Sequence, residues 1–416
     1  MGARPLAGSM ARMRPFASLA SKEEALARLL GAVAPLAATE QVVTVEAAGR
    51  VLAQPVVAPL DVPGFTRSTM DGYAVRAADT FGASTLSPKT LRLLAVTHAG
   101  DPAAPSVLPG TCVQIATGGK LPPGADAVVR VEGTRAGPEG HVVVVEMVTP
   151  GTSLAEQGSD IARGTEVLAP GVVLTPARVG LLASLGLTEV ACYRRPRVLI
   201  LPTGNEIVPL GSPVGEGQIY NSNTHTLAAV VRENGGIPLL HPVVADTLEA
   251  HVAALQKGMA EADLVLVSGG SSVGERDVLQ DAVRPLGEIL VHGVRVKPGK
   301  PLLVARLRSG QALIGFPGNP TSCLMNAYLF LVPALRALAR LPPRPHRTVR
   351  AVLGERVLHQ KGRFQFLPVR LEAGKAYDTF KGSGALTSLS EADGYIGIPE
   401  DVELLEAGTE VEVTLF

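Results

Sequence analysis

We expect a multidomain α/β plus β protein, because three parts of this 416-residue chain carry different patterns. A single hydrophobic core rarely grows beyond about 250–300 residues, so the length predicts two to four domains. Short apolar runs between Gly and Pro turns predict β-structure over 80–148 and again after residue 346. From Arg197 onward, apolar strands alternate with helical patterns, which is typical of a doubly wound α/β sheet.

The N-terminal part predicts an elongated α+β first domain in two segments, 17–60 and 150–190. Residues 18–34 have helical apolar spacing, and Ser21 followed by Glu24 is a capping box. A β-domain is expected as an insertion at 61–149. Further elements of these two domains are expected at 40–45 (strand), 91–95, 111–115, 127–131 and 141–148 (strands of the insertion) and 176–185 (helix).

A doubly wound parallel sheet is expected over 191–342, where ligands would bind beyond the carboxyl ends of the strands. Its strands are predicted at 197–201, 237–243, 264–268 and 312–316, and its helices at 223–234, 247–260, 276–283 and 320–339. The Pro-rich run 341–345 predicts a linker. Short strands and Gly turns predict a small C-terminal β-barrel or sandwich over 346–416.

Charge and composition exclude several classes of protein. The formal net charge is +0, which predicts no binding to nucleic acid or to an anionic membrane. No apolar run is expected to approach the length of a membrane span, and residues 1–14 lack the apolar core of a signal peptide. Cys112, Cys192 and Cys323 are far apart without metal spacing, which predicts buried thiols in a reducing, cytoplasmic compartment.

The run from Pro63 to Val75 predicts a shaped functional loop. Its Gly and Pro residues make it too irregular for a helix or a strand, and it carries Ser68 and Asp71. Ordered irregular loops often hold chemistry.

Four loops of the α/β region carry groups suited to anions. Thr203 and Glu206 follow the first strand, and Gly269, Gly270 and Ser271 follow a later one, where backbone N–H groups can approach a phosphate. Lys297 and Lys300, two of only nine lysines, lie on one Pro-stiffened loop. The last of these loops, 315–322, opens the final helix. A plain turn or a solvated basic turn is the alternative for each loop.

Five carboxylates lie in loops or at strand ends: Asp71, Asp160, Glu206, Asp246 and Asp277. Hard oxygen ligands of this kind suit Mg²⁺, which also binds phosphate oxygens. Each of them alone is better explained as a surface or capping acid. As a set beside anion-binding loops, they predict metal-assisted phosphoryl chemistry.

Five motifs in this order resemble the molybdopterin molybdenumtransferase family, which includes the MoeA proteins and the gephyrin E domain. They are Ser68–Ala74, Pro202–Glu206, Ser268–Gly274, Lys297–Pro301 and Pro317–Pro320. The resemblance runs from about residue 17 to the C-terminus. It implies four domains, a homodimer with clefts lined by both subunits, and conversion of adenylylated molybdopterin and molybdate, with Mg²⁺, to molybdenum cofactor and AMP.

The resemblance also implies site residues. Glu206, Asp246 and Asp277 would lie at the metal and phosphate end, and Asp71, Asp160, Glu206 and Asp277 would be the catalytic acids. The substrate-binding set would be Ser68, Thr117, Thr203, Gly269, Gly270, Ser271, Lys297, Lys300, Asn319, Ser322, Arg363 and Ser383. Five members of this set resemble the molybdate pocket of the family: Lys297, Lys300, Ser322, Arg363 and Ser383.

Three positions depart from the family pattern. Thr66 and Arg67 stand where Asp and Asn are common, and Asn205 stands before Glu206 where an Asp is frequent. Two other functions stay open: molybdopterin adenylyltransferase and a gephyrin-like scaffold. For the transferase we expect catalysis by positioning and charge neutralisation, since His225, His241 and the other histidines fall in no catalytic pattern. Partner proteins would be an adenylyltransferase or molybdoenzymes.

Overall fold

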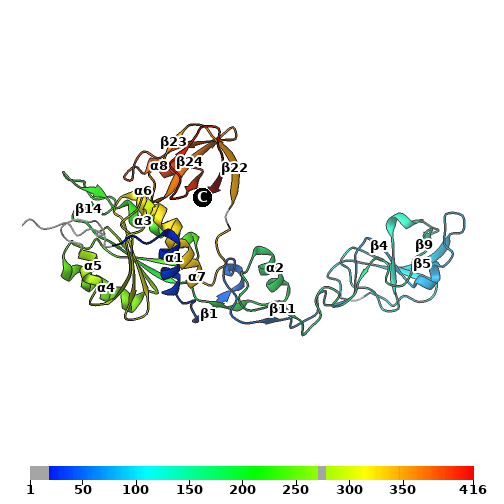
Figure 1. Cartoon of the computed structure of the whole chain (residues 1–416). Helices are drawn as coiled ribbons and strands as arrows, with labels where there is room; N and C mark the ends of the chain where they lie inside the picture. The colour runs from blue at the N-terminus through cyan, green and yellow to red at the C-terminus, as the bar shows by residue number, and fades with distance from the viewer. Residues whose placement is uncertain (1–17, 103, 270–277, 346) are drawn as a thin grey trace, which may run out of the picture. The chain divides into compact units, whose positions relative to one another are not determined.

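The computed structural model describes residues 18–102, 104–269, 278–345 and 347–416. The chain forms two compact units, one from Gln41–Cys192 and the other from the residues up to Glu40 together with Tyr193–Phe416 (Figure 1). The boundaries of the four expected domains stay predictions.

The Gln41–Cys192 unit contains a six-stranded sheet in the order β7-β4-β6-β5-β9-β8. The side chains of adjacent residues on its strands pack in two different hydrophobic clusters. Val75 and Val129 belong to one cluster, and Ala74 and Val128 belong to the other. Because side chains alternate along a strand, both faces of the sheet are buried. The strands are β4 (Gly72–Val75), β5 (Lys89–Thr97), β6 (Thr111–Ile115), β7 (Ala127–Arg130), β8 (Thr134–Ala136) and β9 (His141–Val144).

A third core of this unit includes helix α2 (Pro176–Ser184). Thr175 caps this helix by accepting from the backbone N–H of Arg178, and Leu182 is fully buried. Three two-stranded pairings accompany it. They join β1 (Thr39–Val43) to β12 (Glu189–Tyr193), β2 (Val56–Val57) to β11 (Glu166–Leu168) and β3 (Arg67–Ser68) to β10 (Leu154–Ala155); 3₁₀ turns lie at Thr44–Glu46, Ala77–Thr80 and Val131–Gly133.

The expectation that the run from Pro63 to Val75 contains no strand is wrong. The run contains β3, which pairs with β10, and β4, which is a strand of the six-stranded sheet. The pattern is hard to recognise because β3 has only two residues and Gly72 starts β4 without a side chain. Asp71 lies on the bend between these two strands.

The other unit contains a six-stranded sheet in the order β16-β13-β17-β21-β20-β18. Its first four strands are parallel, with helices on both faces, which confirms the doubly wound α/β fold. β20 and β18 run antiparallel, so the expectation of a wholly parallel sheet is wrong on that side. The strands are β13 (Arg197–Pro202), β16 (Ile237–Leu240), β17 (Leu264–Ser268), β18 (Gly287–His292), β20 (Leu303–Leu307) and β21 (Ala312–Phe316).

The helices of this unit start at the caps that the sequence provides. The capping box of Ser21 and Glu24 is present at α1, and Asn221 and Thr247 cap α3 and α4. The helices are α1 (Lys22–Gly31), α3 (Ser222–Glu233), α4 (Leu248–Glu261), α5 (Val278–Val283), α6 (Pro320–Asn326) and α7 (Val332–Leu338), with a π-helical segment, η4 (Ala327–Leu331), between the last two.

One helical stretch, Pro320–Leu338, is long and apolar enough to cross a membrane by length and composition, with a mean hydropathy of 1.3. The expectation that no apolar run has this length is therefore wrong. However, 67% of the apolar segment in this stretch is buried inside the protein. Phe330 and Leu335 pack there in the core on one side of the sheet. The stretch is apolar because it is a core helix.

The C-terminal part is a closed barrel, as expected. β24, β25, β22, β28 and β26 follow one another, and β26 pairs back onto β24. β19 (Val296–Lys297) adds to β24 in parallel from outside this ring. The remaining elements are β22 (Thr348–Leu353), β23 (Val357–Leu358), β24 (Phe364–Glu372), β25 (Lys375–Asp378), α8 (Thr387–Ser390), β26 (Gly394–Ile398), β27 (Leu404–Leu405) and β28 (Glu410–Leu415).

All three cysteines are free and buried, as expected. Burial raises the pKa of Cys112 to about 12. Burial also raises the pKa of Cys323, and this pKa is about 12 even though a hydrogen bond with the Ser268 side chain lowers it. These thiols stay protonated at neutral pH and are poor metal ligands.

Candidate active site

The carboxylate of Asp71 is held by the loop that follows β6. The backbone N–H of Thr117 donates to Oδ1 at 2.6 Å, and the Thr117 hydroxyl donates to the same oxygen at 2.9 Å. These hydrogen bonds lower the pKa of Asp71 below its ordinary value. Asp71 is exposed, so an ionised carboxylate is presented to solvent at a fixed point.

We expect Thr117→Val to raise the pKa of Asp71 part of the way to the ordinary carboxyl value, because the backbone donor remains. The folded-state pKa is depressed, so the hydrogen bonds stabilise the fold above the ordinary pKa, and this is lost as pH falls through the lowered pKa. NMR titration of ¹³C-labelled aspartate would measure the shift. Thr134→Val, which removes a hydroxyl bonded to the carbonyl of Val131, is the control. An unchanged Asp71 pKa in Thr117→Val would contradict the assignment.

Ser68 is 2% exposed, and the observed hydrogen bonds of its hydroxyl lie within its own turn. Its hydroxyl donates to the Met70 carbonyl at 2.5 Å and accepts from the Met70 N–H at 3.3 Å. Its backbone exchanges hydrogen bonds with Gly118 and Gly119. Ser68 thereby ties the bend that carries Asp71 to the loop that carries Thr117.

Asp160 lies on another loop of the same unit. Its side chain is exposed, and its backbone N–H donates to the Val62 carbonyl at 3.1 Å. Within the described ranges, no hydrogen bond joins Asp160 to Asp71 or Thr117. The structure therefore joins Asp71 to Thr117 and shows no such hydrogen bond for Asp160 among the described residues.

Several predicted residues of the other unit follow adjacent parallel strands. Thr203 follows β13 and Gly269 follows β17, at the carboxyl edge of the sheet. The Thr203 N–H donates to the Ser268 carbonyl at 2.9 Å. A Cβ on Gly269, whose φ is +99°, would lie 2.5 Å from the Thr203 carbonyl oxygen. Glycine is therefore required for these two loops to touch.

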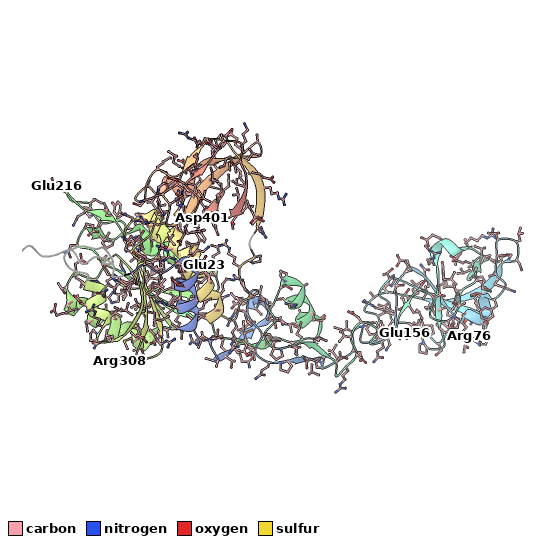
Figure 2. The ribbon with its side chains drawn as sticks, viewed as in Figure 1. Glu23, Arg76, Glu156, Glu216, Arg308 and Asp401 are labelled. Atoms are coloured by element: carbon pink, nitrogen blue, oxygen red, sulfur yellow. The ribbon has the colours of Figure 1, made fainter. Side chains whose placement is uncertain are left out.

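Glu206 and Asp246 come from neighbouring loops at this edge. The Asn205 N–H donates to Asp246 Oδ2 at 3.3 Å, and the Asp246 N–H donates to Asn205 Oδ1 at 3.4 Å. The Glu206 carboxylate folds over Gly204, where a Cβ would lie 2.7 Å from Oε2. The segment that follows extends as an arm, closed at its base by β14 (Ile207–Val208) and β15 (Ile219–Tyr220), with Glu216 near its tip (Figure 2).

Gly270, Ser271 and Asp277 lie outside the described residues. Among the residues that are described, no group of three or more His, Cys, Asp and Glu side chains is arranged to hold a metal. Glu206 and Asp246 nevertheless supply hard carboxylate oxygens from adjacent loops, which is the donor chemistry that Mg²⁺ prefers.

The loop with Lys297 and Lys300 joins β18 to β20 in the sheet and pairs with the barrel through β19. Lys297, half-buried, ends β19, where its register partner is Gln365 of β24. Arg363 lies two residues before Gln365, and the Nε2 of His359 lies 2.7 Å from the Arg363 carbonyl oxygen. The register thus brings Arg363 close to the lysine loop, although 66 and 63 residues of chain separate it from Lys297 and Lys300.

Asn319, Ser322 and Ser383 gather at the start of α6. Asn319 Nδ2 donates to Ser383 Oγ at 3.0 Å, and the Thr321 N–H donates to the Ser383 carbonyl at 3.1 Å. The Thr321 hydroxyl donates to the carbonyl of Ala385 at 2.8 Å. Ser322 is 3% exposed. The barrel loop that carries Ser383 is therefore attached to the helix that carries Asn319 and Ser322.

A cavity of about 370 Å³ in the barrel has Arg356, Asp378 and Lys381 in its wall. Burial and the negative charge of Glu355 raise the pKa of Asp378, while the Phe380 N–H and the positive charge of Lys297 lower it; the net pKa is raised. Lys297 therefore acts electrostatically on a wall of this cavity.

Asn223 was not predicted as a site residue. Its Nδ2 donates to Ser268 Oγ at 2.9 Å and to the Gly318 carbonyl at 2.8 Å. A Cβ on Gly318 would lie 3.7 Å from the Gly269 Cα. Asn223 thus joins the loops after β17 and β21. Its position in the first turn of a helix that follows a strand was the available signal.

Family models match the chain in order along its length. Residues 20–186 match the MoeA N-terminal region (domain I and II), 199–337 match the probable molybdopterin binding domain, and 350–416 match the MoeA C-terminal region (domain IV).

Relatives and a solved structure match over most of the chain. A Mycobacterium tuberculosis protein named molybdopterin molybdenumtransferase 2 is 39% identical over 379 residues, covering 88% of this chain and 93% of that protein. The Haemophilus influenzae molybdopterin molybdenumtransferase is 31% identical, covering 88% and 93%. The crystal structure of a Pyrococcus horikoshii molybdopterin biosynthesis MoeA protein has a TM-score of 0.81 and 33% identity, covering 96% of this chain and all of that one. These matches confirm the resemblance: this chain belongs to the MoeA family of molybdopterin molybdenumtransferases.

Proposed function

We propose that this chain is an enzyme of molybdenum cofactor biosynthesis that inserts molybdenum from molybdate into adenylylated molybdopterin, with Mg²⁺, and releases AMP. The observation that carries the proposal is the arrangement around α6. Asn319 and Thr321 bind the loop of Ser383, and the other end of α6 contacts the lysine loop at Gly299. Hydroxyl donors and two ammonium groups therefore share one rigid support, which suits a tetraoxoanion.

The sheet edge with Thr203, Glu206, Asp246 and Gly269 would receive the phosphoanhydride and AMP part of the substrate. Glu206 and Asp246, with Asp277, would hold Mg²⁺. When bound, this ion would neutralise charge on the phosphate oxygens. The polypeptide binds and orients the two substrates at adjacent sites, so that catalysis rests on positioning and charge neutralisation.

Asp71, Thr117 and Asp160 belong to the unit Gln41–Cys192, for which we propose a role of its own in substrate binding and catalysis. The fixed, ionised carboxylate of Asp71 supports this role, since it is exposed and its hydrogen bonds come from the uncharged Thr117. We further propose a homodimer in the cytoplasm, as implied by the family resemblance, with no nucleic acid or membrane partner. An adenylyltransferase that supplies the substrate, or molybdoenzymes that receive the product, would be protein partners.

The test is AMP release from adenylylated molybdopterin by the full chain, with Mg²⁺, in the presence and absence of molybdate. We expect AMP release that depends on molybdate and Mg²⁺. Adenylylation of molybdopterin from ATP, with no AMP release, would instead identify an adenylyltransferase. Inactivity in both assays would overturn the proposal and would leave a gephyrin-like scaffold as the remaining function.

A further inference from the structure

Asn326, the last residue of α6, is a polar side chain in the core of the α/β domain. It is fully buried, with an exposed fraction of 0%. Its Nδ2 donates to the carbonyl oxygen of Gly299 at 3.0 Å. Its Oδ1 is buried and has no hydrogen-bond partner among the described residues. The π-helical segment begins at the next residue, and such segments are frequent at functional sites.

Gly299 lies against the amide of Asn326. A Cβ at residue 299 would lie 2.3 Å from Nδ2, 2.9 Å from Cγ and 3.0 Å from Oδ1, and the φ of Gly299 is +113°. Both the contact and the dihedral angle require glycine. The amide therefore holds this point of the loop by a hydrogen bond and by close packing.

The contact lies between the two lysines. On one side, Lys297 is held by the pairing of β19 with β24. On the other side, the carbonyl of Lys300 accepts from the N–H groups of Val294 and Leu302, both at 2.9 Å. The Asn326 hydrogen bond holds the part of the loop between these anchors, and with it the backbone positions from which the two lysine side chains extend.

A plain packing role explains Asn326 poorly. Burying an amide without satisfying its oxygen costs free energy, whereas Leu has the same number of side-chain heavy atoms and would bury only apolar ones. Asn326 also lies four residues after Ser322, on the same face of α6. The helix therefore presents a predicted oxyanion ligand and the contact to the lysine loop on one side.

We propose that Asn326 is a positioning residue for oxyanion binding: through Gly299 it sets Lys297 and Lys300 at the spacing that molybdate needs. This inference rests on the proposed function, because it assumes that these lysines bind the oxyanion. Asn326 itself does not touch the substrate.

The first test compares Asn326→Leu with the wild type in direct molybdate binding by the full chain. We expect affinity to fall roughly 10-fold, the effect of one buried hydrogen bond. In the AMP-release assay the KM for molybdate should rise by a similar factor, while the KM for adenylylated molybdopterin should stay unchanged. A general loss of folding would raise neither KM selectively.

The second test uses Asn326→Asp, which preserves the shape of the side chain. The ionised carboxylate of this variant cannot donate to Gly299, but its protonated carboxyl group can, and burial raises the pKa of a carboxyl group. At about pH 8, N326D should therefore bind molybdate more weakly than the wild type. The difference in affinity from the wild type, measured at each pH, should shrink as pH is lowered to about 6. N326L should show no such recovery.

The outcomes separate the two hypotheses. If the wild type fails to bind molybdate, the proposed function falls, and this inference falls with it. If the wild type binds, Lys297→Ala abolishes binding and N326L binds as tightly as the wild type, the positioning role alone is overturned. If N326L does not fold, absence of pH-dependent recovery in N326D overturns the inference.

Discussion

Lys297→Ala is expected to lower molybdate-dependent AMP release by roughly 10²- to 10³-fold, as does removal of one preorganised donor from an oxyanion site. The side chain is half-buried on a loop held at both ends, so its charge is placed before the oxyanion arrives. Preorganised charge in a partly desolvated site acts more strongly than the same charge in water.

The substitution should leave the fold intact. The pairing of Lys297 with Gln365 uses backbone atoms, which alanine retains. Lys257→Ala is the matched control, because Lys257 is an exposed lysine of α4. Both variants are assayed for AMP release over a range of molybdate concentrations. Equal activity of the two variants would remove Lys297 from the site.

Gly72→Ala is expected to destabilise the six-stranded sheet by more than about 3 kcal/mol, the range of severe overpacking. A Cβ at this buried position would lie 2.0 Å from the Val129 carbonyl oxygen and 3.0 Å from the Arg130 Cα. These atoms belong to the backbone of β7, so no side-chain rotation relieves the clash. β4 would have to separate from β7, moving the adjacent Asp71 away from Thr117.

Hydrogen exchange resolves this effect locally, which matters because unfolding of a chain with two units is not a single transition. We expect amides of β4, β6 and β7 to lose protection while those of β13 and β17 keep it. Gly180→Ala is the control: it lies in α2, where a Cβ would meet nothing within 4 Å, and should stabilise the helix by about 0.5–1 kcal/mol. Unchanged protection of β4 in Gly72→Ala would contradict the packing argument.

Apolar runs bounded by breakers were predictable from the sequence, whereas strands that are recognisable only from the strands they pair with were not. The strands Leu264–Ser268 and Ala312–Phe316 were predicted with their observed bounds, because each is a short apolar run between breakers. β18 and β20 were missed because their antiparallel pairing is visible only when the sheet is assembled. β3 was missed because two residues carry no period.

The candidate site shows the same division. Charged and glycine-rich loops drew attention to Lys297, Lys300 and Gly269, but Asn223 and Asn326 act through amides on residues that are distant in sequence. All six asparagines of the chain lie between residues 205 and 326. Which carbonyl each amide binds depends on tertiary packing, which no local pattern records.

The pairing of β19 with β24 has a consequence for protein engineering by domain exchange. The second half of β24 pairs with β25, whereas its first residues, Phe364 and Gln365, have β19 as a parallel neighbour contributed from before the linker. A graft cut at the linker would leave that short edge open and would separate Arg363 and Ser383 from the lysine loop. A chimaera that preserves this junction must therefore carry residues 296–297 together with the barrel, as a discontinuous building block.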